Sequence, residues 1–152
     1  MDSASGRMEL RIGMMALALL GAAQTASAAT DPAAWVRRIL VEYDQIQIKQ
    51  GWTPQGEARP GALASGEESS LDFDLAAGAA YRFVVLCEAA CGAGEVELLD
   101  PAGARVGEAG ALVEMPKIQA TPAAAGRYRL RVAMTDCASA ACAWSARLYA
   151  KP

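Results

Sequence analysis

Four cysteines in two close pairs have the most definite chemistry in this sequence. Three residues separate Cys87 from Cys91, and four residues separate Cys137 from Cys142. Thiols at these spacings can form two disulfides, or all four can bind one zinc ion. In an oxidising compartment the thiols meet an oxidant first, so the spacing predicts disulfides and no zinc.

The sequence around the cysteines indicates which of them pair. Each pair comes directly after a strand-like run that begins Tyr-Arg, and each is followed by another such run. The simplest interpretation is local pairing, Cys87 with Cys91 and Cys137 with Cys142, which closes the loop between two strands. Pairing between the two loops remains an alternative if both loops lie at one end of the domain.

Two pairs of carboxylates could support acid–base chemistry. Asp72 and Asp74, and likewise Glu95 and Glu97, are two residues apart, so on a strand each pair points to one face. A glycosidase needs two carboxylates that flank the scissile bond. A small sandwich offers little room for a deep cleft, however, and a solvated face accounts for such pairs without catalysis. A small carboxylate-based hydrolase is therefore the alternative hypothesis.

Calcium is the second chemistry that the acidic residues allow. Glu95, Glu97 and Asp100 would supply the hard oxygen ligands that this ion takes. The competing interpretation is that the two glutamates form exposed ion pairs with Arg129 and Arg131 on a neighbouring strand. We expect the ion pairs, no metal cofactor, and at most a weak calcium site at these three residues.

Other common site chemistries lack the residues they require. The chain has no histidine, which removes the usual base of serine and cysteine hydrolases. It has no glycine-rich phosphate loop. Trp52 and Trp144 could form a platform for a sugar, but Trp144 alternates in phase with apolar residues and is predicted to lie in the core.

The N-terminal segment has the features of a secretory signal peptide. Arg7 and Arg11 precede an apolar run over residues 12–23, and Ala26-Ser27-Ala28 is a small-residue cleavage site. The run is shorter than the roughly 20 residues that span a bilayer. We expect cleavage after Ala28 and a periplasmic or secreted protein. Cleavage a few residues earlier, or retention of residues 1–28 as an anchor, are alternatives.

The remaining chain of about 124 residues is long enough for one domain with its own core. The net charge is −3, and basic residues are interspersed with acidic ones. This distribution offers no basic surface for nucleic acid and no basic amphipathic helix for a membrane surface. We expect a monomer that does not span the membrane after processing.

The first element of the mature chain is predicted to be a helix within residues 29–51. Asp31 and Pro32 are a favourable start, and Gly51 is a plausible end. Trp35, Ile39 and Tyr43 recur at helical spacing and form an apolar stripe, which Val36 and Leu40 widen.

The apolar stripe has one evident binding surface in the rest of the chain. The strand predicted over 80–87 has Phe83 and Val85 on one face, and Val84 and Leu86 on the other. A strand that is apolar on both faces must be covered on both. We therefore expect the helix to pack on Val84 and Leu86 through its apolar stripe.

The rest of the chain favours antiparallel β structure. Residues 52–66 are rich in glycine, proline and small polar residues and predict an irregular linker. Seven short alternating runs then follow within residues 67–152, which is typical of a sandwich or barrel. These runs cover 71–75, 80–87, 94–99, 104–108, 111–119, 127–135 and 142–150.

Four motifs resemble the bacterial pre-peptidase C-terminal (PPC) domain family and its stand-alone periplasmic relatives. They are an L-x-x-G-x-x-Y strand at 75–81, an acidic strand at 95–98, a D-P-x-G turn at 100–103, and a P…G-x-Y-x-x-x-V ending at 122–132. The resemblance implies a jelly-roll-like β-sandwich that serves secreted proteins as an accessory domain without catalysis. Glu95 and Glu97 stand where the family prefers aspartate, which weakens any calcium site carried over from it.

The sequence thus predicts a mainly β protein, an antiparallel jelly-roll-like sandwich with an N-terminal amphipathic helix packed on one sheet. It predicts a non-catalytic exported module that binds an envelope protein or polysaccharide, or that acts as an accessory or inhibitor of a secreted enzyme.

Overall fold

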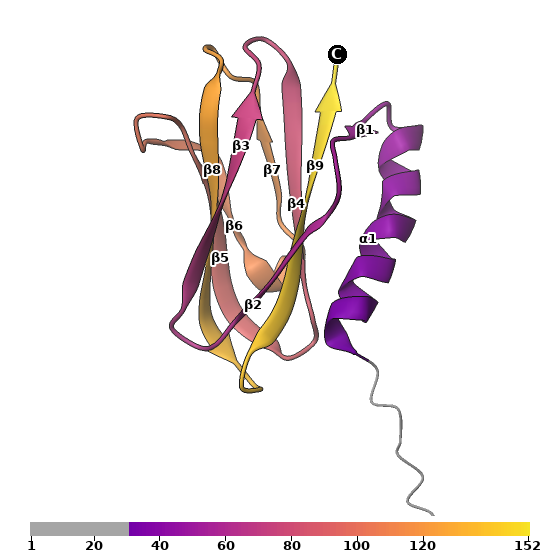
Figure 1. Cartoon of the computed structure of the whole chain (residues 1–152), viewed down its shortest axis with the longest axis vertical. Helices are drawn as coiled ribbons and strands as arrows, with labels where there is room; N and C mark the ends of the chain where they lie inside the picture. The colour runs from indigo at the N-terminus through magenta and orange to yellow at the C-terminus, as the bar shows by residue number, and fades with distance from the viewer. Residues whose placement is uncertain (1–30) are drawn as a thin grey trace, which may run out of the picture.

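The structure, a computed structural model, describes residues 31–152. The predicted signal peptide 1–28 lies outside the described residues. From Asp31 onward one helix is followed by two antiparallel sheets that pack face to face (Figure 1). The helix lies against one sheet, which confirms the predicted mainly β sandwich with an N-terminal helix. No helix within 31–152 has the length and apolar character needed to cross a membrane.

The two sheets differ in what covers their outer faces. We call the sheet under the helix the helix-side sheet and the other the open sheet. The strands of the helix-side sheet are β1 (Thr53–Pro54) and β2 (Arg59–Leu63), both paired with β9 (Cys142–Lys151), then β4 (Ala80–Cys87) and β7 (Lys117–Ala120). The strands of the open sheet, in spatial order, are β3 (Glu68–Leu75), β8 (Gly126–Cys137), β5 (Cys91–Leu99) and β6 (Arg105–Ala111).

The main core fills the space between the sheets. In β8, Tyr128, Leu130, Val132 and Met134 are all buried and alternate with exposed or half-buried arginines, as the sequence pattern predicts. Trp144 of β9 is also buried in this core. The predicted run 111–119 is less regular than expected, because the short 3-10 helix η1 (Leu112–Glu114) separates β6 from β7.

Residues 52–66, predicted to be an irregular linker, contain the edge strands β1 and β2. Strand β2 pairs with β9 from Arg59 opposite Ala146 to Leu63 opposite Cys142. An edge strand accepts proline because one side of its backbone needs no partner. At Gly61 the indole of Trp144 lies so close that a Cβ atom would be 2.4 Å from the ring. Glycine here permits close packing, so the sandwich begins before residue 67.

The helix α1 (Pro32–Lys49) begins and ends where the sequence signals place it. The Asp31 carboxylate accepts a hydrogen bond from the backbone N–H of Ala33 at 3.0 Å, which caps the first turn. Gly51 follows the last turn with a φ of +83°, a left-handed conformation that favours glycine.

The helix docks on the predicted face of β4, but its buried side is rotated by about one residue. Val36 and Leu40 are each 1% exposed and pack with Val84 and Leu86. The predicted stripe of Trp35, Ile39 and Tyr43 is half-buried and packs along one flank of this cluster. The buried face of α1 continues beyond Leu40 with two polar residues. A prediction from the spacing of apolar residues does not include them, which explains the rotation.

Asp44 and Gln47 are those two polar residues, and both have partners on the sheet. The Asp44 carboxylate accepts two bonds from Arg147, at 3.1 and 2.8 Å, and one from the Tyr149 hydroxyl at 2.6 Å. Burial, together with the adjacent Asp44 carboxylate, raises the pKa of Tyr149. Gln47 accepts from Arg82 at 2.6 Å. These buried bonds fix the position of α1 along the sheet, because each partner would be unsatisfied in another register.

Trp52 completes this second cluster and lies beneath a cation. The guanidinium of Arg82 is 4.2 Å from the centre of the indole ring, and Trp52 itself is buried. Trp52 and Trp144 are therefore both packed inside the protein and do not form the platform for a sugar that the sequence allowed.

Shortening a buried helix residue tests how much the docked helix stabilises the fold. Leu40→Ala should lower the free energy of unfolding by about 2–5 kcal/mol, because it leaves a cavity against β4 and β9. The half-buried Ile39→Ala should cost less. Val41→Ala, at a side chain that is 63% exposed, is the matched control and should change stability by no more than about 0.5 kcal/mol. Urea unfolding measures all three, and equal effects at positions 40 and 41 would contradict the docking.

Candidate functional site

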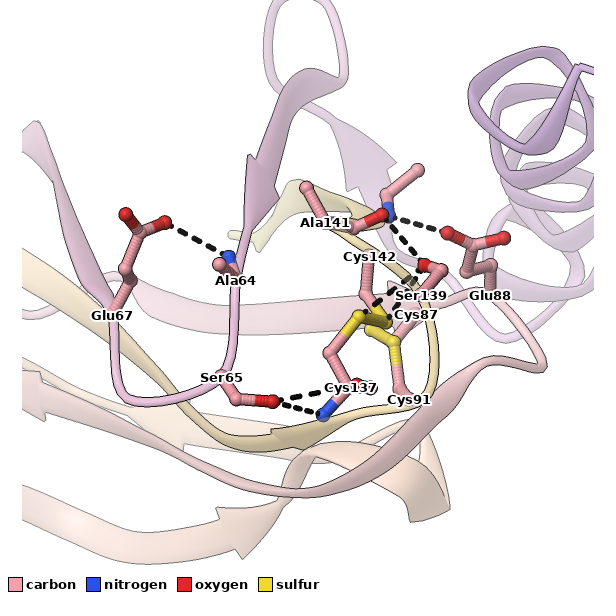
Figure 2. The surroundings of a disulfide bond; sticks show 11 residues. Ala64, Ser65, Glu67, Cys87, Glu88, Cys91, Cys137, Ser139, Ala141 and Cys142 are labelled. Atoms are coloured by element: carbon pink, nitrogen blue, oxygen red, sulfur yellow. Dashed lines mark hydrogen bonds between the residues drawn. A yellow bond between two sulfur atoms is a disulfide. The ribbon is translucent and has the colours of Figure 1, made fainter.

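Both disulfides lie at the same end of the sandwich. Cys87 is joined to Cys91 with a Cα–Cα distance of 6.2 Å, and Cys137 to Cys142 with 5.9 Å (Figure 2). Cys91 and Cys137 are also opposed residues in the β5–β8 pairing. The two loops therefore meet, as the alternative connectivity required, and yet each cysteine is joined within its own loop.

Each disulfide closes a loop at which the chain passes between the sheets. Strand β4 belongs to the helix-side sheet and β5 to the open sheet, and the order is reversed for β8 and β9. The repeated Tyr-Arg strand and cysteine loop of the sequence is thus a repeated crossover. We call the loops 64–67, 88–90 and 138–141 together the disulfide end.

Hydrogen bonds connect the three loops of the disulfide end. The Ser65 hydroxyl accepts from the N–H of Cys137 at 2.8 Å, and the Glu88 carboxylate accepts from the N–H of Ala143 at 2.8 Å (Figure 2). The N–H of Ala138 donates to the carbonyl of Ala90 at 2.9 Å. Loops that are cross-linked and hydrogen-bonded to one another in this way have little conformational freedom to lose when a partner binds.

The surface of the disulfide end combines small side chains with a hollow. Residues 138–141 are all exposed, and three of the four are alanine. Beside the 88–90 loop, where α1 begins, lies a hollow of about 300 Å³. We call it the Trp35 hollow. It is lined by Pro32, Trp35, Glu88 and Ala89.

The acidic pair of β3 lies on the outer face of the open sheet and is matched by arginines. Asp72 is opposite Arg129, with 2.9 Å between the carboxylate and the Nε atom. Asp74 is opposite Arg127 at 3.5 Å. The hydrogen bond from Arg129 holds the pKa of Asp72 below its ordinary value. A general acid needs the opposite, a raised pKa, so Asp72 is poorly suited to acid catalysis.

The glutamates of β5 follow the expected ion pairing only in part. Glu97 lies opposite Arg131 and forms an ion pair with it, and Arg131 also binds Glu68 at 3.0 Å. Glu95, in contrast, lies opposite Ala133 and does not face Arg129. The predicted ion pair with Arg129 was therefore wrong for Glu95. The pairing of β5 with β8 shifts in register between Cys91 and Gly94, and the alternation of residues in the sequence does not predict such a shift.

The three candidate calcium ligands do not converge on one point. One oxygen of Asp100 accepts from the backbone N–H groups of Ala102 and Ala104, both at 2.9 Å, and so closes the turn after β5. Glu97 is engaged by Arg131, while Glu95 is exposed further along the strand. Within residues 31–152, no three acidic, cysteine or histidine side chains are grouped as a metal site requires.

A second hollow, a depression beside the D-P-x-G turn, lies next to the carboxylates of the open sheet. It has a volume of about 250 Å³. Asp72 and Asp100 line it together with Arg127 and Arg129, so the acids are balanced by an equal number of cations. This arrangement lacks the isolated pair of carboxylates that glycoside hydrolysis uses.

The chain was compared with protein families, curated proteins and solved structures. No family model matches the chain, and no curated protein matches it. The solved structures that are similar to this chain include two of PliG, a periplasmic lysozyme inhibitor of g-type lysozyme. The Aeromonas hydrophila protein is 13% identical, with 67% of this chain and 90% of that chain covered and a TM-score of 0.47. The Salmonella Typhimurium protein is 17% identical, with 67% and 92% covered and a TM-score of 0.42.

Sequence reasoning located the cysteines of the disulfide end but missed the Trp35 hollow. The helical spacing predicts only a packing role for Trp35, and no pattern predicts a role for Glu88. The one available signal was a charged residue placed directly after Cys87, inside a loop that is otherwise alanine. Nothing in the sequence indicates that this loop meets the first turn of the helix.

Titration of Asp72 tests the charge pairing on the open sheet. Its pKa should lie below the ordinary value of 3.8 and rise in Arg129→Gln, because Arg129 donates the hydrogen bond that stabilises the carboxylate. Since the folded pKa is the lower one, this stabilisation is present above the unfolded pKa and is lost as pH falls through the folded pKa. NMR of the side-chain carboxyl carbon measures the shift. Arg127→Gln, which removes a weaker influence, should change the pKa less.

Calorimetry with calcium tests the metal hypothesis. We expect no saturable binding in the micromolar range to calcium-free protein, because Arg131 already balances Glu97 and Asp100 is committed to its turn. Glu97→Gln is the informative variant. A stoichiometric micromolar isotherm that disappears in this variant would make the acidic strand a metal site.

Proposed function

We propose that this chain is an exported, non-catalytic module that binds another protein, either a component of the cell envelope or a secreted enzyme. The observation that supports this function best is the disulfide end. There, the two crossover loops lie side by side, and the 88–90 loop lines the Trp35 hollow together with the first turn of α1.

The disulfide end has the physical properties of a binding surface. Its loops are fixed before a partner arrives, so association costs less conformational entropy than it would for flexible loops. The small side chains of 138–141 let a partner approach the backbone closely. Trp35 offers a large, rigid aromatic group, the kind that often dominates binding energy at protein interfaces.

The open sheet supports the non-catalytic part of the proposal. Its carboxylates are exposed or bound to arginines, and the pKa of Asp72 is shifted away from what an acid catalyst needs. A hydrolase that uses Glu95 and Glu97 would require a cleft around them, and the depression described above lies instead beside Asp100.

The compartment and the family are further parts of this proposal. Two closed disulfides suit the oxidising periplasm or exterior to which the predicted signal peptide would direct the chain. The motifs at 75–81 and 100–103 support a relation to the PPC domains.

Capture of partners from the native envelope tests the function. Immobilised protein should retain a defined protein from an envelope extract, and Ala140→Arg at the disulfide end should abolish retention. Ala123→Arg is the matched control, since it places the same side chain at an exposed position before β8, at the other end of that strand. Inhibition is measured in parallel against a panel of secreted hydrolases that includes g-type lysozyme.

Three outcomes would contradict the proposal. Retention that Ala140→Arg leaves unchanged would place the partner elsewhere on the protein. Retention of polysaccharide alone would identify a glycan-binding module. Hydrolysis of an envelope polymer that is abolished by Glu95→Gln would establish the enzyme alternative.

A further inference from the structure

We infer that the Trp35 hollow receives the side chain of an arginine or lysine from the protein partner. This inference rests on the proposed function and names the chemistry by which the disulfide end recognises its partner. The hollow is lined by one aromatic residue, Trp35, by the apolar residues Pro32 and Ala89, and by one acidic residue, Glu88.

The lining of the hollow matches the two parts of a long basic side chain. The methylene stem of lysine or arginine is apolar and can lie along Pro32 and Ala89. The charged head is attracted both to the indole, the best aromatic partner for a cation, and to a carboxylate within reach. Among residues 31–152, no basic residue lines the hollow.

Glu88 is held in place while its charge remains available. Its carboxylate accepts a hydrogen bond from the backbone N–H of Ala143, and its loop is closed by the Cys87–Cys91 disulfide (Figure 2). Among residues 31–152, the ion pairs do not include Glu88. A positioned carboxylate without a cationic partner is the group that a basic side chain would complete.

The adjacent helix end does not oppose a cation. The N-terminus of a helix carries about half a positive charge, which by itself would disfavour a basic ligand. Asp31 places a full negative charge at this end and caps the Ala33 N–H. Arg37 approaches Asp31 only to 3.9 Å, on the exposed surface.

The other two tryptophans differ from Trp35, because one already has a cation over its ring and the other is enclosed in the core. Trp52 already has the guanidinium of Arg82 above its ring, and Arg82 donates in turn to Gln47. Trp144 is enclosed in the core beneath Gly61. In the described part of the chain, no cation lies over Trp35. Trp35 therefore differs from Trp52 in having no cation over its ring among residues 31–152.

NMR titration with model side chains tests the inference. The probes are Nα-acetyl-L-arginine methylamide and its lysine counterpart, added to isotope-labelled protein purified from the periplasm of an expressing bacterium. Nα-acetyl-L-norleucine methylamide, which has a similar stem and no charge, is the matched control. We expect saturable shifts of the Trp35 indole N–H and of the amides 88–90 with the basic probes only.

Two variants separate the contributions to binding. Glu88→Gln retains an oxygen acceptor for the Ala143 N–H but removes the charge, and should weaken binding of the arginine probe about two- to fivefold, as expected for an exposed charge pair. Trp35→Leu retains an apolar side chain for packing and should weaken it at least about threefold through loss of the cation–aromatic contact. Glu95→Gln, on the open sheet, should leave binding unchanged.

The possible results separate this inference from the proposed function. Equal shifts with the norleucine probe, or binding that is insensitive to Glu88→Gln, would show that the hollow does not select a cation. If partner capture still depends on position 140 while the titration is flat, the inference fails and the proposed function stands. If capture fails while the basic probes bind, the hollow has the stated chemistry and the proposed partner is wrong.

Discussion

The fold depends on one constraint, the burial of both faces of β4. Phe83 and Val85 point into the space between the sheets, while Val84 and Leu86 point outward and would be exposed without a covering element. Because water disfavours such a surface, the helix α1 must dock there. Its docking carries Trp35 to the loop after β4 and so forms the Trp35 hollow.

The disulfides contribute more to the shape of the surface than to stability. Loops as short as these gain only about 2 kcal/mol each from the chain-entropy effect of the cross-link. Their position matters more, because both close a crossover between the sheets at the same end of the molecule. With Ser65 bonded to Cys137 and Glu88 to the N–H of Ala143, this end becomes a fixed surface on an otherwise regular sandwich.

On the open sheet, acidic residues that could act in catalysis or bind a metal are instead paired with arginines. Asp72 and Glu97 look like catalytic or metal-binding groups when they are considered alone. In the sheet each faces an arginine across the strand pairing and forms an ion pair with it. A partner that covered this face would have to displace water from many satisfied charges, at a cost that favours binding elsewhere.

The sequence by itself determined the features that local patterns encode, namely the helix start at Asp31, the alternation of β8, and the two apolar faces of β4. It also indicated the local cysteine pairs. The tertiary structure decided which strand lies opposite which, so the partner of Glu95, the edge strand β2 and the inner polar face of α1 were not predictable from spacing. The Trp35 hollow belongs to this second group. Trp35 and Glu88 are distant in the chain, and only the docking of the helix on β4 and the crossover after Cys87 place them around one space.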